Sequence, residues 1–421
     1  MKVMGSGQSG KSERGQILII LALVLPILVL FSALAIDVGF AYVTKARLSK
    51  AVDAACLSGM RNLSQGQATA QALALNSFNA NYPTTGLDAS APVVSISFST
   101  NASGSQFINV NATATIRTFF MQYLPQWKTL TVKESAQALR STLVMSLVLD
   151  RSGSMVGNGG GTALINAGPS FVQNFSSTDY MSMISFASNA TVNVAMANNN
   201  ISNISNTIKG WNLGTFTGGT FGPGGVTLAK IQEEGVNPSG NVVKVMVYFT
   251  DGHVNTVQDT FACTSGWGDT LYNYGGYDSG NSCHFFEPSA GTDWGSLVSG
   301  NPPHTPTPNC TGITNFYSQQ NKQQENFTAN NIAPEARYRA LQTANDMLNE
   351  GIVIYSIGLG TDIDETFLKQ LANDRSSPTY DPNLPQGLAV FAPDCPSSTC
   401  TQELNQVFQT IAAKILLRLT Q

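Results

Sequence analysis

An uncharged apolar run near the N-terminus limits the possible folds of the chain more than any other feature. Ile17 to Ile36 is 20 residues long and contains no charged side chain. A helix of this length spans the hydrocarbon core of a bilayer, because each residue adds about 1.5 Å to a core of about 30 Å. A secretory signal peptide is the rival interpretation, and Ala33 and Ala35 offer a weak cleavage signal for it. We favour a retained membrane helix, because the run exceeds the usual signal core.

The composition favours a protein that works outside the cytosol and does not bind nucleic acid. Charged residues make up only 11% of the 421 residues and the net charge is −4, so the basic surface that nucleic acid requires is not expected. Five cysteines lie in the C-terminal half, in surroundings that favour disulfides in an oxidising compartment. They are Cys263, Cys283, Cys310, Cys395 and Cys400. Their pairing stays open; Cys395 with Cys400 and Cys263 with Cys283 are two possible loops.

The N-terminal third predicts a tail, a membrane helix and a small α+β module. Residues 1–16 are polar and basic and are expected to form a cytoplasmic tail, followed by a transmembrane helix over 17–40. Residues 41–140 form an Ala-rich helix and a β linker module. The helix is expected to run from 41 to about 80 and to end before Pro83. Strands are predicted over 93–98, 107–116 and 130–132, because side chains alternate there with period two.

From Thr142 onward, strands alternate with helices, which predicts a doubly wound, Rossmann-like α/β domain over 141–421. Residues 191–196 are expected to pair with 181–186 as an edge hairpin. The predicted strands are 143–149, 181–186, 242–249 and 352–357. The predicted helices are 163–175, 201–209, 226–234, 334–350, 364–372 and 402–419.

One long segment interrupts this alternation. Residues 253–333 are rich in Gly, Asn, Ser, Thr, Pro and aromatic residues and show no strong helix or strand pattern. A loop of this length is unusual inside a compact domain. We therefore predict an insertion that is stapled by disulfides and partly disordered. Cys263, Cys283 and Cys310 with His284 could also bind zinc, but their spacing matches no standard zinc pattern, so disulfides are favoured.

Two strand ends carry side chains suited to a metal ion. Leu143–Leu149 reads as a buried strand, and it is followed by Asp150, Ser152 and Ser154. Asp251 likewise follows the apolar strand 242–249. Open α/β sheets bind ligands at the carboxyl ends of their strands, and carboxylate and hydroxyl oxygens suit Mg²⁺. The simpler alternative is a polar turn in which Ser or Asp caps a helix.

These residues also carry a resemblance to von Willebrand factor A domains. Asp150-Arg151-Ser152-Gly153-Ser154 resembles the D-x-S-x-S signature of that family, Gly218-Gly219-Thr220 resembles its Gly-Gly-Thr loop, and Thr250-Asp251-Gly252 resembles its Thr-Asp-Gly. The resemblance implies a metal-ion-dependent adhesion site. It assigns the ligands Asp150, Ser152, Ser154, Thr220 and Asp251, with Thr217 or Thr215 as substitutes for Thr220. The expected ion is Mg²⁺, with Ca²⁺ or Mn²⁺ as alternatives.

The N-terminus resembles a second family. Residues 14–60, including Ala35-Ile36-Asp37-Val38-Gly39, are similar to TadE/TadG-type proteins of bacterial Tad (tight adherence) pilus assembly. TadG-like proteins join such a segment to a C-terminal von Willebrand A domain. The resemblance implies a single-pass protein of the bacterial inner membrane whose C-terminal domain is extracytoplasmic. It further implies that the domain binds an acidic residue of a pilus or secretion component.

Two other functions remain as alternatives. A released surface adhesin would share the metal site and lack the membrane helix. A metal-dependent hydrolase is less favoured, because the chain contains neither a P-loop nor a G-x-S-x-G nucleophile motif and no general base is evident beside the oxygen cluster. We therefore expect a binding protein and no enzyme.

Overall fold

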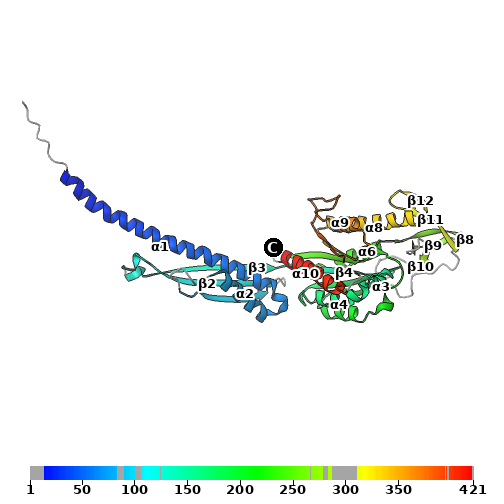
Figure 1. Cartoon of the computed structure of the whole chain (residues 1–421), viewed down its shortest axis with the longest axis horizontal. Coiled ribbons are helices and arrows are strands. Elements are labelled where there is room, and N and C mark those ends of the chain that lie inside the picture. Colours follow the sequence, from blue (N-terminus) through cyan, green and yellow to red (C-terminus); the bar gives the residue numbers. More distant parts are fainter. Residues whose placement is uncertain are drawn as a thin grey trace, which may run out of the picture. The chain divides into compact units, whose positions relative to one another are not determined.

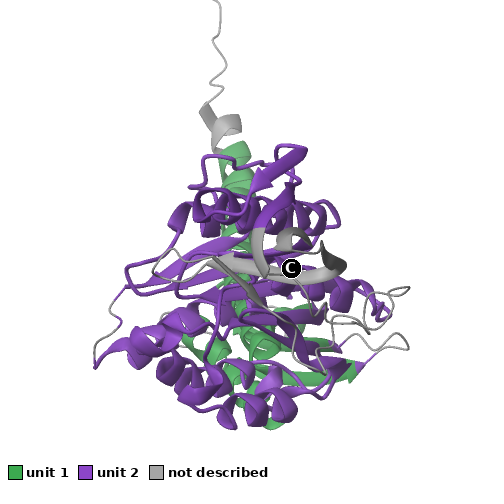
Figure 2. Ribbon diagram, turned by 90° about the vertical axis from the view of Figure 1, so that its right-hand side faces the viewer, with its two compact units in different colours: residues 1–62, 67–99, 107–138 green, residues 63–66, 100–106, 139–421 purple. Residues whose placement is uncertain are grey.

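The structure is a computed structural model that describes residues 14–82, 90–100, 106–123, 125–265, 267–277, 283–286, 311–393, 395 and 398–419. The chain divides into two compact units, coloured separately in Figure 2. Unit 1 comprises residues 1–62, 67–99 and 107–138. Unit 2 comprises 139–421 together with the short segments 63–66 and 100–106.

Unit 1 is built on one long helix. Helix α1 spans Arg14–Arg61, and its first part extends beyond the other elements of this unit (Figure 1). It is the one helix in the described part of the chain that is long and apolar enough to cross a membrane. Its second part packs against α2 (Gln67–Asn81) and a sheet ordered β1-β2-β3 (Val93–Thr100, Gln106–Arg117, Thr129–Arg140).

The predicted single helix over residues 41–80 is wrong. The chain breaks it between Arg61 and Gln67, where a short 3₁₀ turn (η1, Leu63–Gln65) reverses its direction. Gly66 has φ of +98°, a conformation that glycine adopts without the steric strain of a side chain. The reversal lets α1 and α2 pack against each other. Small residues of α2, such as Ala70 and Ala74, are fully buried in this contact.

Unit 2 contains a six-stranded sheet with helices on both faces. The strand order is β14-β13-β7-β4-β5-β6, parallel except for the β5–β6 pair, which forms the predicted antiparallel edge hairpin. The strands are β4 (Thr142–Asp150), β5 (Tyr180–Phe186), β6 (Ala190–Asn198), β7 (Val242–Thr250), β13 (Val353–Leu359) and β14 (Leu388–Ala392). The predicted doubly wound α/β fold is confirmed, although the short strand β14 was not foreseen.

The two faces of β4 explain its nearly uninterrupted apolar sequence. Leu147 and Leu149 lie in a core formed with α4 (Gly160–Val172), α5 (Ile201–Lys209) and α10 (Cys400–Arg418). Val148 lies in the opposite core, which is formed with α6 (Gly222–Glu234), α8 (Ala329–Asn349) and α9 (Glu365–Leu371). A strand covered on both faces has no solvent side, so its side chains need not alternate in polarity.

The region after β7, in which the sequence showed no strong strand pattern, contains strands. Five strands form an antiparallel sheet ordered β10-β9-β8-β11-β12, and they account for most of the described residues between 256 and 326. Their bounds are β8 Thr256–Ser265, β9 Trp267–Tyr277, β10 Cys283–Phe286, β11 Thr311–Ser318 and β12 Gln323–Asn326. The side chains of Cys263, Cys283 and Cys310 lie outside the described residues, so the disulfides predicted there stay predictions.

One disulfide is described, between Cys395 and Cys400, with a Cα–Cα distance of 4.9 Å. It connects the residues after β14 to the start of α10, and both cysteines are buried. Cys56 of unit 1 is a free, buried thiol whose Sγ contacts the carbonyl oxygen of Ala136 at 3.2 Å. The Cys395–Cys400 disulfide corresponds to one of the two pairings that were considered possible from the sequence.

Candidate metal centre

The candidate centre forms where the carboxyl ends of β4 and β7 meet. These strands are parallel neighbours, with Leu149 opposite Phe249, so that Asp150 ends one strand directly beside Thr250 at the end of the other. The chain leaves β4 toward β5 on one side and later returns to β7 on the other side. This reversal of strand order is the place where open α/β sheets bind ligands.

A series of hydrogen bonds through Ser152 and Ser154 links the two carboxylates. The hydroxyl of Ser154 donates to Oδ1 of Asp251 at 2.7 Å, and it lies 2.9 Å from the hydroxyl of Ser152. The backbone N–H of Ser152 donates to Oδ1 of Asp150 at 2.7 Å. The structure therefore brings together four of the five predicted ligands: Asp150, Ser152, Ser154 and Asp251.

The fifth predicted ligand, Thr220, is held at the same edge by its loop. The Gly153 N–H donates to the carbonyl oxygen of Gly218 at 3.1 Å, which joins this loop to the one that carries Ser152. Gly218 has φ of +83° and therefore occupies a conformation suited to glycine. Thr220 is buried, and its own N–H donates to Oδ1 of Asn255 at 2.7 Å, just before α6 begins.

The two substitutes for Thr220 are placed differently. The Thr215 hydroxyl accepts a hydrogen bond from the Asn212 N–H at 3.1 Å, as part of a capping box for a 3₁₀ turn (η4, Leu213–Thr215). Thr217 is exposed, and its N–H donates to the carbonyl oxygen of Arg151 at 3.0 Å. Thr220 remains the better candidate, because it is the buried threonine of the three.

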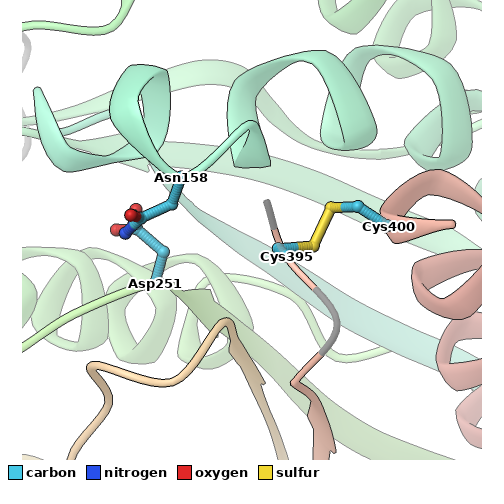
Figure 3. The surroundings of a disulfide bond; sticks show 4 residues. All are labelled: Asn158, Asp251, Cys395 and Cys400. Atoms are coloured by element: carbon cyan, nitrogen blue, oxygen red, sulfur yellow. A yellow bond between two sulfur atoms is a disulfide. The ribbon is translucent and has the colours of Figure 1, made fainter. Parts of the chain in front are cut away.

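The sequence did not identify two residues that complete the hydrogen bonding of the carboxylates. The Thr250 hydroxyl donates to Oδ2 of Asp150 at 2.5 Å, and Nδ2 of Asn158 donates to Oδ2 of Asp251 at 3.2 Å. Figure 3 shows the side chains of Asn158 and Asp251 pointing toward each other. Thr250 stands in the Thr-Asp-Gly motif and was open to prediction. Asn158 follows the short helix α3 (Ser154–Gly157) and carries no such sequence signal.

Burial makes both carboxylates costly to keep charged. Asp150 is fully buried and Asp251 is 1% exposed. Burial raises the pKa of both groups, and the charge of Asp251 raises the pKa of Asp150 further. The hydrogen bonds described above come from hydroxyl and amide groups, which lower these pKa values only in part.

This arrangement fits a divalent cation. Two buried carboxylates and a row of hydroxyls form a hard, all-oxygen set of donors, which Mg²⁺, Ca²⁺ and Mn²⁺ prefer. A bound divalent ion supplies the positive charge that neutral hydrogen-bond donors do not. Within the described residues no three acidic, Cys or His side chains gather at one place, so hydroxyl groups would have to complete the coordination.

Comparison with a known family identifies the N-terminal segment. Residues 15–62 match the family model described as "Putative Flp pilus-assembly TadE/G-like". The matched stretch is nearly the whole of α1. The resemblance predicted from residues 14–60 is confirmed, so the chain carries a TadE/G-like segment in front of its α/β domain. No curated protein matches the chain.

Solved structures with similar folds include three proteins of low sequence identity. The PilB minor pilin of Streptococcus sanguinis is 13% identical, with a TM-score of 0.40, over 78% of this chain and 79% of that one. The von Willebrand domain of the pilus tip protein Mfa5 from Porphyromonas gingivalis is 15% identical, with a TM-score of 0.38, over 68% and 98%. Proximal thread matrix protein 1 of the mussel byssus is 14% identical, with a TM-score of 0.36, over 66% and 47%. The chain thus spans about half of the mussel protein.

Proposed function

We propose that the chain is a membrane-anchored, metal-dependent protein-binding module that acts in Tad-type pilus assembly or surface adherence. The observation that carries the metal dependence is the pair of buried carboxylates, Asp150 and Asp251, linked by hydrogen bonds through Ser152 and Ser154. The TadE/G-like match over residues 15–62 supports the pilus-assembly role. In this proposal Thr220 is the fifth ligand.

The proposed ligand of the metal is a carboxylate from a protein partner. Mg²⁺ prefers six oxygen ligands and commonly keeps some positions for water or substrate. Ser154 and Gly153 are exposed, whereas Asp150 and Ser152 are buried, so the centre is open on the side of the 151–154 turn. An acidic side chain from a pilus or secretion component can approach there and complete the coordination.

The proposed location is the bacterial inner membrane, with unit 2 outside the cytoplasm. Helix α1 supplies the length and hydropathy for one crossing. The buried Cys395–Cys400 disulfide supports an oxidising compartment for unit 2. A released adhesin that lacks the membrane helix is the alternative. Mapping the mature N-terminus distinguishes the two, because a start near Asp37 indicates release.

The test of metal dependence is a titration of the full-length protein in detergent with Mn²⁺ and Mg²⁺, followed by calorimetry. The variant Asp150→Asn keeps the shape of the side chain and removes its charge, so we expect it to abolish binding. Asp346→Asn is the matched control, because Asp346 is an exposed carboxylate on α8. Equal affinity of wild type and Asp150→Asn for the ion would contradict the proposal.

The test of partner binding is photo-crosslinking in cells that express the full pilus system. We expect crosslinks from the 151–154 turn to appear with wild type and with Asp346→Asn, and to be absent with Asp150→Asn or after chelation. Crosslinks that persist under both treatments would remove the metal-dependent version of the function. Hydrolysis of a phosphate ester by wild type and its loss in Asp251→Ala would instead support the hydrolase alternative.

A further inference from the structure

A loop of unit 1 carries four exposed aromatic side chains at the point where α1 changes its surroundings. The loop joins β2 to β3 and is described over 118–123 and 125–128, including the 3₁₀ turns η2 (Met121–Tyr123) and η3 (Pro125–Trp127). Phe119, Phe120, Tyr123 and Trp127 are 42%, 46%, 84% and 45% exposed. Large aromatic residues that gather on a surface in this way mark a site of interaction.

The burial pattern of α1 shows that its contacts with the rest of unit 1 begin at Asp37. Between 19 and 36 every residue except Ala33 is exposed, as expected for a helix whose partner is lipid. Asp37 is the first buried residue, at 2% exposure, and from there one face of the helix is buried against the rest of unit 1, through Thr44 and Leu48. The apolar run also ends at Ile36. Both patterns therefore give the same boundary.

Asp37 binds the β2–β3 loop at this point of α1. Its carboxylate accepts the backbone N–H groups of three consecutive loop residues: Phe119 at 2.7 Å, Phe120 at 3.1 Å and Met121 at 2.8 Å. Successive backbone amides that converge on one anion form a strong, charge-assisted contact. The ring of Phe119 also packs on Phe40, one turn farther along α1, with ring centroids 4.8 Å apart.

Two cations lie at the base of the same loop. Arg117 and Lys128 are both exposed, and they stand where β2 ends and β3 is about to begin. Thr118 closes this base, because its N–H donates to the carbonyl oxygen of Lys128 at 3.2 Å and its hydroxyl to that of Trp127 at 2.8 Å. The loop thus has aromatic residues at its tip and positive charges at its base.

We propose that the β2–β3 loop is a second membrane contact, which inserts Phe120, Tyr123 and Trp127 into the interface of the bilayer that α1 crosses. Tyr and Trp favour the boundary between headgroups and hydrocarbon, and Lys and Arg beside them reach the phosphate groups. The position of Asp37 directly after the apolar run puts the loop at that depth. This proposal rests on the proposed membrane anchorage of α1 and assigns Asp37 as the residue that positions the loop.

The test measures the depth of Trp127 in full-length protein reconstituted into vesicles of phosphatidylethanolamine and phosphatidylglycerol. Lipids brominated near the carbonyl end of the acyl chain quench nearby tryptophans, and iodide quenches those in water. The chain has four tryptophans, so the signal of Trp127 is the difference between wild type and Trp127→Phe. We expect strong quenching of this difference by the brominated lipid and weak quenching by iodide. The matched control is Trp211→Phe in unit 2, whose difference signal should not respond to brominated lipid.

The variants separate the positioning role of Asp37 from a general loss of folding. Asp37→Ala removes the acceptor of three amides and should lose most of the lipid quenching of Trp127, and Asp37→Asn, which keeps one acceptor oxygen, should lose less. The double variant Phe120→Ser, Tyr123→Ser changes only exposed side chains and should raise iodide quenching of Trp127 with unit 1 intact by circular dichroism.

The outcomes distinguish this inference from the membrane anchorage on which it rests. Vesicle flotation reports on the anchorage, because a membrane-spanning α1 makes the protein float whether or not the loop inserts. Protein that does not float with vesicles would contradict the anchorage and the loop contact together. Protein that floats, but whose Trp127 is quenched by iodide and not by brominated lipid, would overturn the loop contact and leave the anchorage standing; a protein partner on the loop would give this second result.

Discussion

Thr250 shows how a residue can complete a site without being one of its predicted ligands. It is the last residue of β7, and its hydroxyl donates to Asp150, 100 positions earlier in the chain. Asp150, Ser152, Ser154 and Asp251 were predictable because local sequence at strand ends identifies them. Asn158 and Asn255 were not, because their roles depend on which strands become neighbours and how the following loops turn.

We predict that Thr250→Val lowers the free energy of unfolding of unit 2 by about 1–3 kcal/mol, because it leaves a buried carboxylate oxygen without its donor. Val has nearly the same shape, so packing should change little. Urea unfolding of the metal-free protein measures the effect. Thr410→Val is the control, since this residue is exposed on α10. A Thr250→Val protein as stable as wild type would show that the hydroxyl is not needed to hold Asp150.

Glu233 gives a second prediction at this scale. It is fully buried on α6, and burial raises its pKa from 4.5 to about 8. A hydrogen bond with Ser146 lowers this pKa only in part. Between pH 4.5 and about 8, Glu233 therefore keeps its proton in the folded state and loses it in the unfolded chain. The stability that this proton supports is fully present below about pH 4.5 and is lost as the pH rises through about 8.

The variant Glu233→Gln removes this titration. We expect it to flatten the pH dependence of the free energy of unfolding between pH 4.5 and about 8 and to be more stable than wild type above that range. Urea unfolding across the pH range measures this difference. Parallel curves for the two proteins would mean that Glu233 ionises alike in the folded and unfolded states.

At the scale of elements, helix α6 connects the metal centre to the core. It begins directly after Thr220 and Phe221, and it lies so close to the sheet that a Cβ at Gly225 would come within 2.9 Å of Val148 and 2.8 Å of Phe186. Glycine at this position therefore sets the distance between helix and sheet. Any displacement of the first turn of α6 also moves Thr220.

We predict that Gly225→Ala destabilises unit 2 by about 1–3 kcal/mol through overpacking and also weakens metal binding. Gly157→Ala is the matched control, because a Cβ there would meet nothing within 4 Å. Urea unfolding and Mn²⁺ titration of both variants measure the two effects. Metal affinity that is unchanged in Gly225→Ala would mean that Thr220 does not depend on the position of α6.

The elements also show where sequence patterns were informative. Strands β4, β5 and β7 were predicted closely, because burial on both faces produces apolar runs that neighbouring turns delimit. The sheet β10-β9-β8-β11-β12 was missed, because its strands contain Gly, Asn, Ser and aromatic residues without regular alternation. Strand β14 has only five residues, four of them half-buried. It therefore shows neither a long apolar run nor an alternation of apolar and polar side chains.

At the scale of the whole molecule, the metal centre belongs to one of two compact units. Asp150, Thr220 and Asp251 all lie in unit 2, whereas unit 1 has its own buried residues on α1, α2 and β2. A ligand stabilises only the cooperative unit that binds it. Metal is therefore expected to act on the unfolding of unit 2 alone.

We predict two unfolding transitions for the full-length protein in calorimetry, of which one shifts with metal. At a Mg²⁺ concentration of about 100 times the dissociation constant, the stabilisation is about 2.7 kcal/mol. Chelation should lower the midpoint of that transition and leave the other unchanged. Asp150→Asn should show the chelated midpoint under both conditions. A chelator effect on both transitions would mean that the units unfold as one.

The unbroken path of α1 has a mechanical consequence. The helix is 48 residues long, or about 72 Å, and it passes from the apolar run into unit 1 without a hinge at Asp37. The three amides bound to Asp37 clamp the sheet to the helix at that level. A displacement of the first turns after Pro26 is therefore passed on through Asp37 to the β2–β3 loop of unit 1.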